Sequence, residues 1–283
     1  MQLVKVFGLM SVMTALFVLA GNYIGGSSFA ILFFGIAVVM NVSAFWFSDR
    51  AVLKMYKAQV IGPSDAPDLY AMVDRLRQNA DLPMPTVAIA PQPQPNAFAT
   101  GRDPEHAVVC VTIGLMNSVN ARELEGVIAH ELAHIKHRHM LVGTLAAVMA
   151  GAITMVGSIL RWGFILGGGR DDDGNPIVAI AMAILAPLAA VVIQMAISRQ
   201  NEFQADATAV RISGDKEGLQ SALRRIEAAA HQVPMNVNPA AAHMAIINPF
   251  SGARGMMRSL FSTHPATEDR IAAIEQVDLR LPA

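Results

Sequence analysis

Four long apolar runs stand out in the pattern of hydrophobic and polar positions along this chain. They cover residues 6–24, 28–47, 141–160 and 177–197. A helix rises 1.5 Å per residue, so about 20 apolar residues cross the roughly 30 Å hydrocarbon core of a bilayer. The pattern therefore predicts four membrane-spanning helices, arranged as two hairpins that a polar region separates.

The first run follows Lys5 and has some features of a secretory signal peptide. It is long for the apolar part of such a peptide, and no small-residue cleavage site leads into a soluble start. We interpret it as a retained anchor. The predicted organisation is a transmembrane hairpin over 1–47, a first soluble part over 48–140, a second hairpin over 141–197 and a second soluble part over 198–283.

Composition also favours a membrane protein. Hydrophobic residues make up 53% of the chain and charged residues 15%, whereas soluble globular proteins carry about 25% charged residues. Disorder is excluded, because disordered chains are poor in apolar residues. The formal net charge of -1 argues against a nucleic-acid partner, since such proteins show a basic surplus or stripe. We expect the lipid bilayer, and no nucleic acid, as a partner.

Basic residues near the ends of the runs predict the orientation, because Lys and Arg are enriched on the cytoplasmic side. If both termini lie on one side, the opposite side carries Arg161 and Arg170 near the membrane. The side of the termini carries Lys5, Arg50, Lys54, Lys57, Lys136, Arg138 and Arg199. The soluble region is therefore expected to face the cytoplasm.

The polar region between the second and third runs shows a helical and then a strand periodicity. Residues 65–79 place their apolar positions on one helical face, whereas 86–90 and 106–113 have the pattern of buried strands. Residues 96–101 fit an extended edge between those strands. The expected fold is mainly α with a small β-sheet (α+β).

The next helix carries the histidine motif of the chain. Asn120 and Glu123 form a capping-box pattern at its start, and the sequence over 130–134 reads HELAH. At about 100° per residue, His130 and His134 share one helical face and can bind one Zn²⁺. Glu131 projects from the adjoining position, where it can take a proton from water instead of binding the metal.

A catalytic zinc site needs a third protein ligand and an open position. Glu202 and Asp206 follow the fourth apolar run and lie one helical turn apart. In the functional interpretation, Glu202 completes a site with two histidines and Asp206 accepts a hydrogen bond from a ligand imidazole. Alone, the pair would be better explained as the solvated face of an ordinary helix, but beside the histidine motif we favour the metal site.

Two further histidines compete for the metal. On a straight helix, His137 lies too far along to meet the same ion as His130 and His134, and His139 faces away. We interpret residues 136–139, which read KHRH, as a basic collar at the membrane interface.

Taken together, these motifs resemble a known family. The histidine motif, the Glu202 and Asp206 turn, the edge at 96–101, and the late Thr263-His264-Pro265 followed by Arg270 are similar to those of the HtpX bacterial membrane zinc metalloproteases. Those enzymes are relatives of the prenyl-protein (CAAX) endopeptidases. The resemblance covers nearly the whole chain, including all four apolar runs.

The resemblance implies a zincin fold of the gluzincin type with four membrane-spanning helices in the cell inner membrane. It implies one Zn²⁺ per chain, held by His130, His134 and Glu202, with Glu131 as the general base. The implied function is hydrolysis of damaged or misfolded membrane proteins and unfolded polypeptides at the cytoplasmic side, as stress-response quality control.

The resemblance also gives roles to residues outside the metal ligands. Asp206 would hold a ligand histidine, His264 would stabilise the oxyanion, and Arg270 would tie the C-terminal helix to the site. Residues 96–98, Asn96, Ala97 and Phe98, would lie in an edge strand that pairs with the substrate backbone.

One alternative of a different class is a non-catalytic membrane scaffold or adaptor whose zinc site is structural. An intact Glu131 argues against it, because a structural site needs no base. Serine and cysteine mechanisms have no support: the chain has no Gly-x-Ser-x-Gly motif, and its single cysteine, Cys110, lies in a predicted strand.

Overall fold

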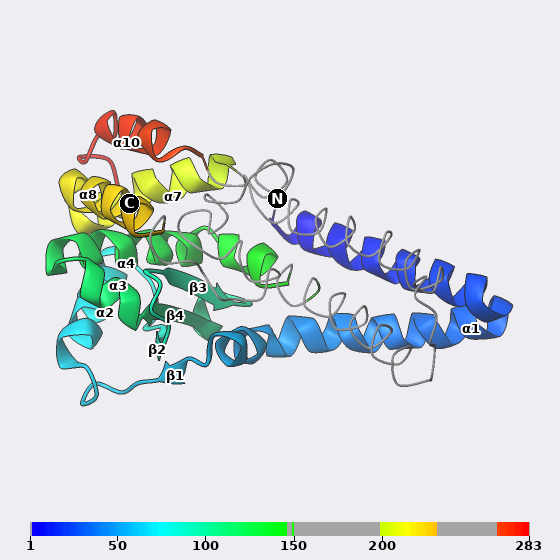
Figure 1. Cartoon of the computed structure of the whole chain (residues 1–283). Helices are drawn as coiled ribbons and strands as arrows, with labels where there is room; N and C mark the ends of the chain where they lie inside the picture. Colours follow the sequence, from blue (N-terminus) through cyan, green and yellow to red (C-terminus); the bar gives the residue numbers. More distant parts are fainter. Residues whose placement is uncertain (1, 146–148, 150–198, 231–264, 283) are drawn as a thin grey trace, which may run out of the picture.

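The computed structural model describes residues 2–145, 149, 199–230 and 265–282 (Figure 1). The predicted spans at 141–160 and 177–197 lie almost wholly outside these residues, and so does His264. The described part is mostly helical with one small mixed sheet, as the sequence predicts.

The N-terminal helix α1 (Gln2–Tyr56) is folded into a hairpin with two antiparallel arms (Figure 1). The chain reverses near Gly26, whose φ of +69° suits a residue without a Cβ atom. Asn41 Nδ2 donates a 2.9 Å hydrogen bond to Thr14 Oγ1. On a straight helix these two residues would lie about 40 Å apart, so this bond holds the two arms side by side.

One described segment, Gly26–Tyr56, is long and apolar enough to cross a membrane, and Val4–Leu19 is an apolar but shorter helix. Large apolar side chains point outward from both arms, among them Phe7, Ile31 and Val39. A helix that is apolar on its exposed side is typical of contact with lipid. The described residues thus contain one candidate span where the sequence predicts two.

The sheet lies beside the end of the hairpin that contains Tyr56 (Figure 1). Its strand order is β1-β2-β4-β3. Its strands are β1 (Gln59–Val60), β2 (Thr86–Ala90), β3 (Ala97–Gly101) and β4 (Ala107–Thr112). Strands β2 and β4 are parallel, whereas β1 and β3 pair antiparallel with their neighbours. The predicted strands at 86–90 and 106–113 are confirmed within a residue at each end, and 96–101 forms the edge strand β3.

The remaining elements of the described residues are helices, several of which pack on the sheet. They are α2 (Pro67–Asn79), the 3₁₀ turn η1 (Pro104–His106), α3 (Ile113–Ser118), α4 (Ala121–Lys136), α7 (Arg199–Ser213), α8 (Lys216–Ala230) and α10 (Thr267–Glu275). The capping box is confirmed: Asn120 Oδ1 accepts from the Glu123 N–H, and the Glu123 side chain accepts from the Asn120 N–H.

Helix α4 lies in the middle of this core. Its apolar side contributes Val127, Ile128 and Leu132, which are buried together with residues of the sheet and of the later helices. Gly126 lets α8 approach closely, because a Cβ atom there would lie 2.7 Å from the backbone nitrogen of Leu219. The backbone of α4 is therefore held in place on both sides, and so is the histidine motif that it carries.

After α4, the chain does not continue as one straight helix into the third apolar run. Helix α4 ends at Lys136, and Arg138 adopts a left-handed conformation with φ of +56°. Residues 139–145 are helical again. One left-handed residue changes the direction of the chain between the two helices, so positions after 138 do not lie where a continuous helix would put them.

Candidate metal centre

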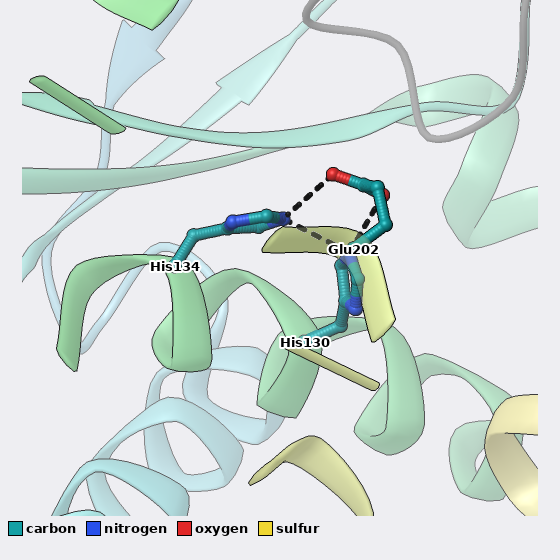
Figure 2. A group of neighbouring side chains, drawn as sticks. All are labelled: His130, His134 and Glu202. Carbon is teal, nitrogen blue, oxygen red and sulfur yellow. Dashed lines mark hydrogen bonds and ion pairs between the residues drawn. The ribbon is translucent and has the colours of Figure 1, made fainter. Parts of the chain in front are cut away.

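Three side chains from two helices converge at one buried point (Figure 2). Helix α4 presents His130 and His134, and the first turn of α7 presents Glu202. The Nε2 atoms of the two histidines are 3.1 Å apart. Glu202 Oε2 lies 3.7 Å from His130 Nε2, and Glu202 Oε1 lies 3.5 Å from His134 Nε2.

These spacings fit a single metal ion. Zn²⁺ binds nitrogen and oxygen at about 2.0–2.2 Å in tetrahedral sites, which puts neighbouring ligand atoms about 3.3–3.6 Å apart. Two imidazole nitrogens and a carboxylate are also the donor set of known catalytic zinc sites. The group His130, His134 and Glu202 therefore has the donors and the spacing to hold a metal ion.

Behind the ligands, Asp206 and Arg270 form a buried ion pair. Asp206 Oδ1 lies 3.0 Å from His130 Nδ1. Arg270, from α10, donates through Nε to Asp206 Oδ2 at 2.8 Å and through Nη2 to Asp206 Oδ1 at 2.6 Å. Both side chains are almost fully buried. The sequence-predicted residues Asp206 and Arg270 are thus brought to the three candidate ligands, and Asp206 lies close enough to His130 to fix the orientation of its ring.

Burial and neighbouring charges shift the pKa values of Asp206 and the two histidines. Burial alone would raise the pKa of Asp206, but the charges and hydrogen bonds of Arg270 and His130 together outweigh burial, and the pKa lies below its usual value. For His130, burial would lower the pKa, but hydrogen bonds to Asp206 and Glu202 raise it to about 9. Burial lowers the pKa of His134 well below its usual value, which favours the neutral imidazole that binds a metal.

Glu131 is buried beside the ligands without belonging to the metal-suited group. Burial raises its pKa to about 7, and the negative charge of Glu202 acts in the same direction. The backbone N–H of Ala99 in β3 donates a hydrogen bond to its carboxylate and opposes the shift. A carboxylate whose pKa lies near neutrality is suited to take up and release a proton.

Strand β3 turns part of its backbone toward this site. Asn96 and Thr112 face each other: the Thr112 N–H donates to Asn96 O, and the Asn96 N–H donates to Thr112 Oγ1. Backbone groups alternate along an antiparallel strand, so those of Ala97 and Ala99 point to the edge where no described strand pairs. The Ala99 bond to Glu131 agrees with this alternation.

The three residues predicted to contact substrate are therefore not equivalent. Ala97 has its backbone on the open edge, whereas Asn96 directs its backbone to β4. The ring of Phe98 packs on Tyr56, with 4.4 Å between centroids, on the face of the sheet that α1 covers. Sequence reasoning did not single out Ala99, although the period of two along a strand points to it once Ala97 is chosen.

The prediction that His139 faces away is wrong. His139 is buried, and its Nδ1 lies 3.2 Å from His134 Nδ1. The cause is the left-handed Arg138, which ends the path of α4 and returns the next residue toward the ligand. Burial lowers the pKa of His139 to about 4, so a basic collar does not describe this residue.

Comparison with known proteins gives one family. Residues 63–278 match the model of a family described as Peptidase family M48. A protein named Protease HtpX homolog from Desulforapulum autotrophicum is 52% identical over 270 residues, which cover 94% of this chain and 87% of the relative. One of the same name from Gemmatimonas aurantiaca is 52% identical over 279 residues, which cover 97% and 99%.

A solved structure shares the fold. The crystal structure of S. mikatae Ste24p matches with a TM-score of 0.50 at 17% sequence identity. The match covers 97% of this chain but 65% of that one, so this chain spans less than two thirds of the larger protein. At this identity the likeness bears on the fold alone.

The buried pair of Arg270 and Asp206 should be essential to stability, and the chain offers a matched control. We expect Arg270→Met to lower the free energy of unfolding by about 3–5 kcal/mol, because it leaves a buried carboxylate without its partner. Arg280 likewise donates two hydrogen bonds to the carboxylate of Asp278, but at the surface, where 91% of the Arg280 side chain is exposed. Arg280→Met should change stability little, since water screens that pair.

Chemical denaturation of the detergent-purified protein measures both variants. Equal stability of Arg270→Met and Arg280→Met would contradict the assigned role of the buried pair.

Proposed function

This chain belongs to peptidase family M48 and is a metalloprotease, and on that premise we propose that it is a zinc-dependent endopeptidase embedded in the bacterial inner membrane. Its proposed substrates are damaged or misfolded membrane proteins and unfolded polypeptides. The observation that carries the proposal is the convergence of His130, His134 and Glu202 beside the buried Glu131.

In the proposed reaction, His130, His134 and Glu202 hold one Zn²⁺. When bound, zinc supplies Lewis-acid polarisation of the scissile carbonyl and lowers the pKa of a water molecule to about 7. Glu131 takes the proton from the attacking water and later gives it to the leaving amine. Its carboxylate is buried beside His130 and Glu202, where a positioned carboxylate can serve both steps.

Substrate binding in this proposal uses the open edge of β3. An extended polypeptide adds to the edge by backbone hydrogen bonds to Ala97 and to the carbonyl of Ala99, whose N–H is bonded to Glu131, in the manner of β-augmentation. Backbone contacts give affinity with little dependence on side chains. Such a site suits an enzyme that removes misfolded proteins of varied sequence. His264, outside the described residues, keeps its proposed role of stabilising the oxyanion.

The proposed location is multi-pass in the inner membrane, with the catalytic site facing the cytoplasm. One apolar helix of sufficient length, Gly26–Tyr56, supports attachment to a membrane. The excess of Lys and Arg beside the soluble region supports its cytoplasmic side. The four-span arrangement belongs to the same proposal and rests on the four apolar runs. The role in stress-response quality control rests on the family resemblance.

Replacing Glu131 by Gln tests the catalytic role. Because Glu131 acts as a base and is not a ligand, we expect Glu131→Gln to keep one zinc per chain and to lose casein hydrolysis almost completely. Zinc is measured by elemental analysis of the purified protein. Glu217→Gln is the control, because the side chain of Glu217 is 76% exposed; it should keep both zinc and activity.

A Glu131→Gln protein that cleaves casein at the wild-type rate would contradict the mechanism. If instead the unaltered protein binds zinc tightly but cleaves no substrate that is tried, a scaffold with a structural zinc site becomes the better account.

The orientation is tested by cysteine labelling in intact cells. In a chain with Cys110 replaced by Ala, an impermeant thiol reagent should label Asp172→Cys from outside. It should label Gln232→Cys only after lysis, because the soluble region is proposed to lie in the cytoplasm. Equal protection of both positions in intact cells would rule out the four-span arrangement.

A further inference from the structure

The second ligand histidine has a neighbour that the proposed mechanism does not use. His134 Nδ1 lies 3.2 Å from His139 Nδ1, on the opposite side of the ring from the Nε2 atom that faces His130 and Glu202. The two rings meet at 66°, with 5.4 Å between their centroids. His134 is therefore contacted through both of its nitrogens.

We propose that His139 is a positioning residue for the ligand His134, and that its Nδ1 accepts the hydrogen bond that fixes the His134 ring. The inference rests on the proposed zinc function. If Nε2 of His134 binds the metal, its Nδ1 must carry the proton and act as a donor. Two donors cannot bond each other, so His139 must be neutral, with its proton on Nε2 and a lone pair on Nδ1.

The two ligand histidines are then held by different partners. Asp206 lies against Nδ1 of His130, and the charge of Asp206 is balanced by Arg270. As a neutral imidazole, His139 would fix the ring of His134 without adding a further negative charge beside Glu202, which lies 3.5 Å from the other side of that ring.

The position of His139 is itself supported by α7. His137 stacks on His139 at an interplanar angle of 25°, with 5.4 Å between centroids. His137 Nε2 lies 2.8 Å from Thr208 Oγ1, and its Nδ1 lies 3.2 Å from Gln204 Nε2. Since α7 also carries Glu202, the helix that supplies the third ligand supports the residue that orients the second.

Zinc affinity of the full-length protein tests the inference independently of activity. We expect His139→Ala to weaken zinc binding about 10–100-fold, the usual effect of removing a hydrogen-bond partner of a metal ligand. His139→Asn should stay close to wild type, because the Asn Oδ1 atom can accept the same hydrogen bond in place of Nδ1. The affinity is measured by competition with a chelator of known zinc dissociation constant.

The control is His106→Ala, because His106 is exposed and pairs with Asp103 at the turn η1 between β3 and β4; the zinc affinity of this variant should not change. The melting temperature of each metal-free variant is measured alongside.

A purely packing role for His139 would make the Ala and Asn variants lose zinc affinity equally. Either that result or wild-type affinity in His139→Ala would overturn the inference. Failure of the unaltered protein to bind zinc would instead refute the proposed function.

Discussion

The carboxylate of Asp206 joins three helices at one buried point. It belongs to α7, it lies against Nδ1 of His130 on α4, and it accepts two hydrogen bonds from Arg270 on α10. A buried carboxylate is costly without such partners, so each helix has a preferred position relative to the others. Glu202, one turn before Asp206, is thereby directed at the two histidines. The geometry of the candidate metal centre depends on this pair.

Strand β3 links the candidate centre to the apolar hairpin. The aromatic contact of Phe98 with Tyr56 fixes one face of the strand on the end of α1. The alanines of β3 pack on the opposite face, in the core that contains α4. Next to the strand, the guanidinium of Arg102 lies over the ring of Trp46, 4.8 Å from its centroid. The edge proposed to bind substrate is thus attached to the candidate membrane helix, which suits substrates that leave the bilayer.

Much of this arrangement follows from local sequence patterns. Periodicity predicts α2, β2 and β4, and the capping box predicts the start of α4, because each depends on residues close in the chain. The spacing of the histidine motif predicts that its imidazoles share a face. The position of His139 could not be predicted in this way, because it depends on the left-handed backbone of Arg138, a conformation that is uncommon for residues other than glycine. Nor does local sequence reveal that Arg270 is buried, since its partner Asp206 lies 64 residues away.

The central claim is that α4 and α7 together form one metal site from two imidazoles and a carboxylate. X-ray absorption at the zinc edge of the full-length protein, loaded with one zinc per chain, tests it most directly. Scattering from the imidazole rings gives the number of histidine ligands, and the distances from the metal to its ligand atoms separate sulfur from nitrogen and oxygen. The account predicts two imidazoles, with the remaining ligands oxygen. A sulfur ligand, or any number of imidazoles other than two, would contradict it.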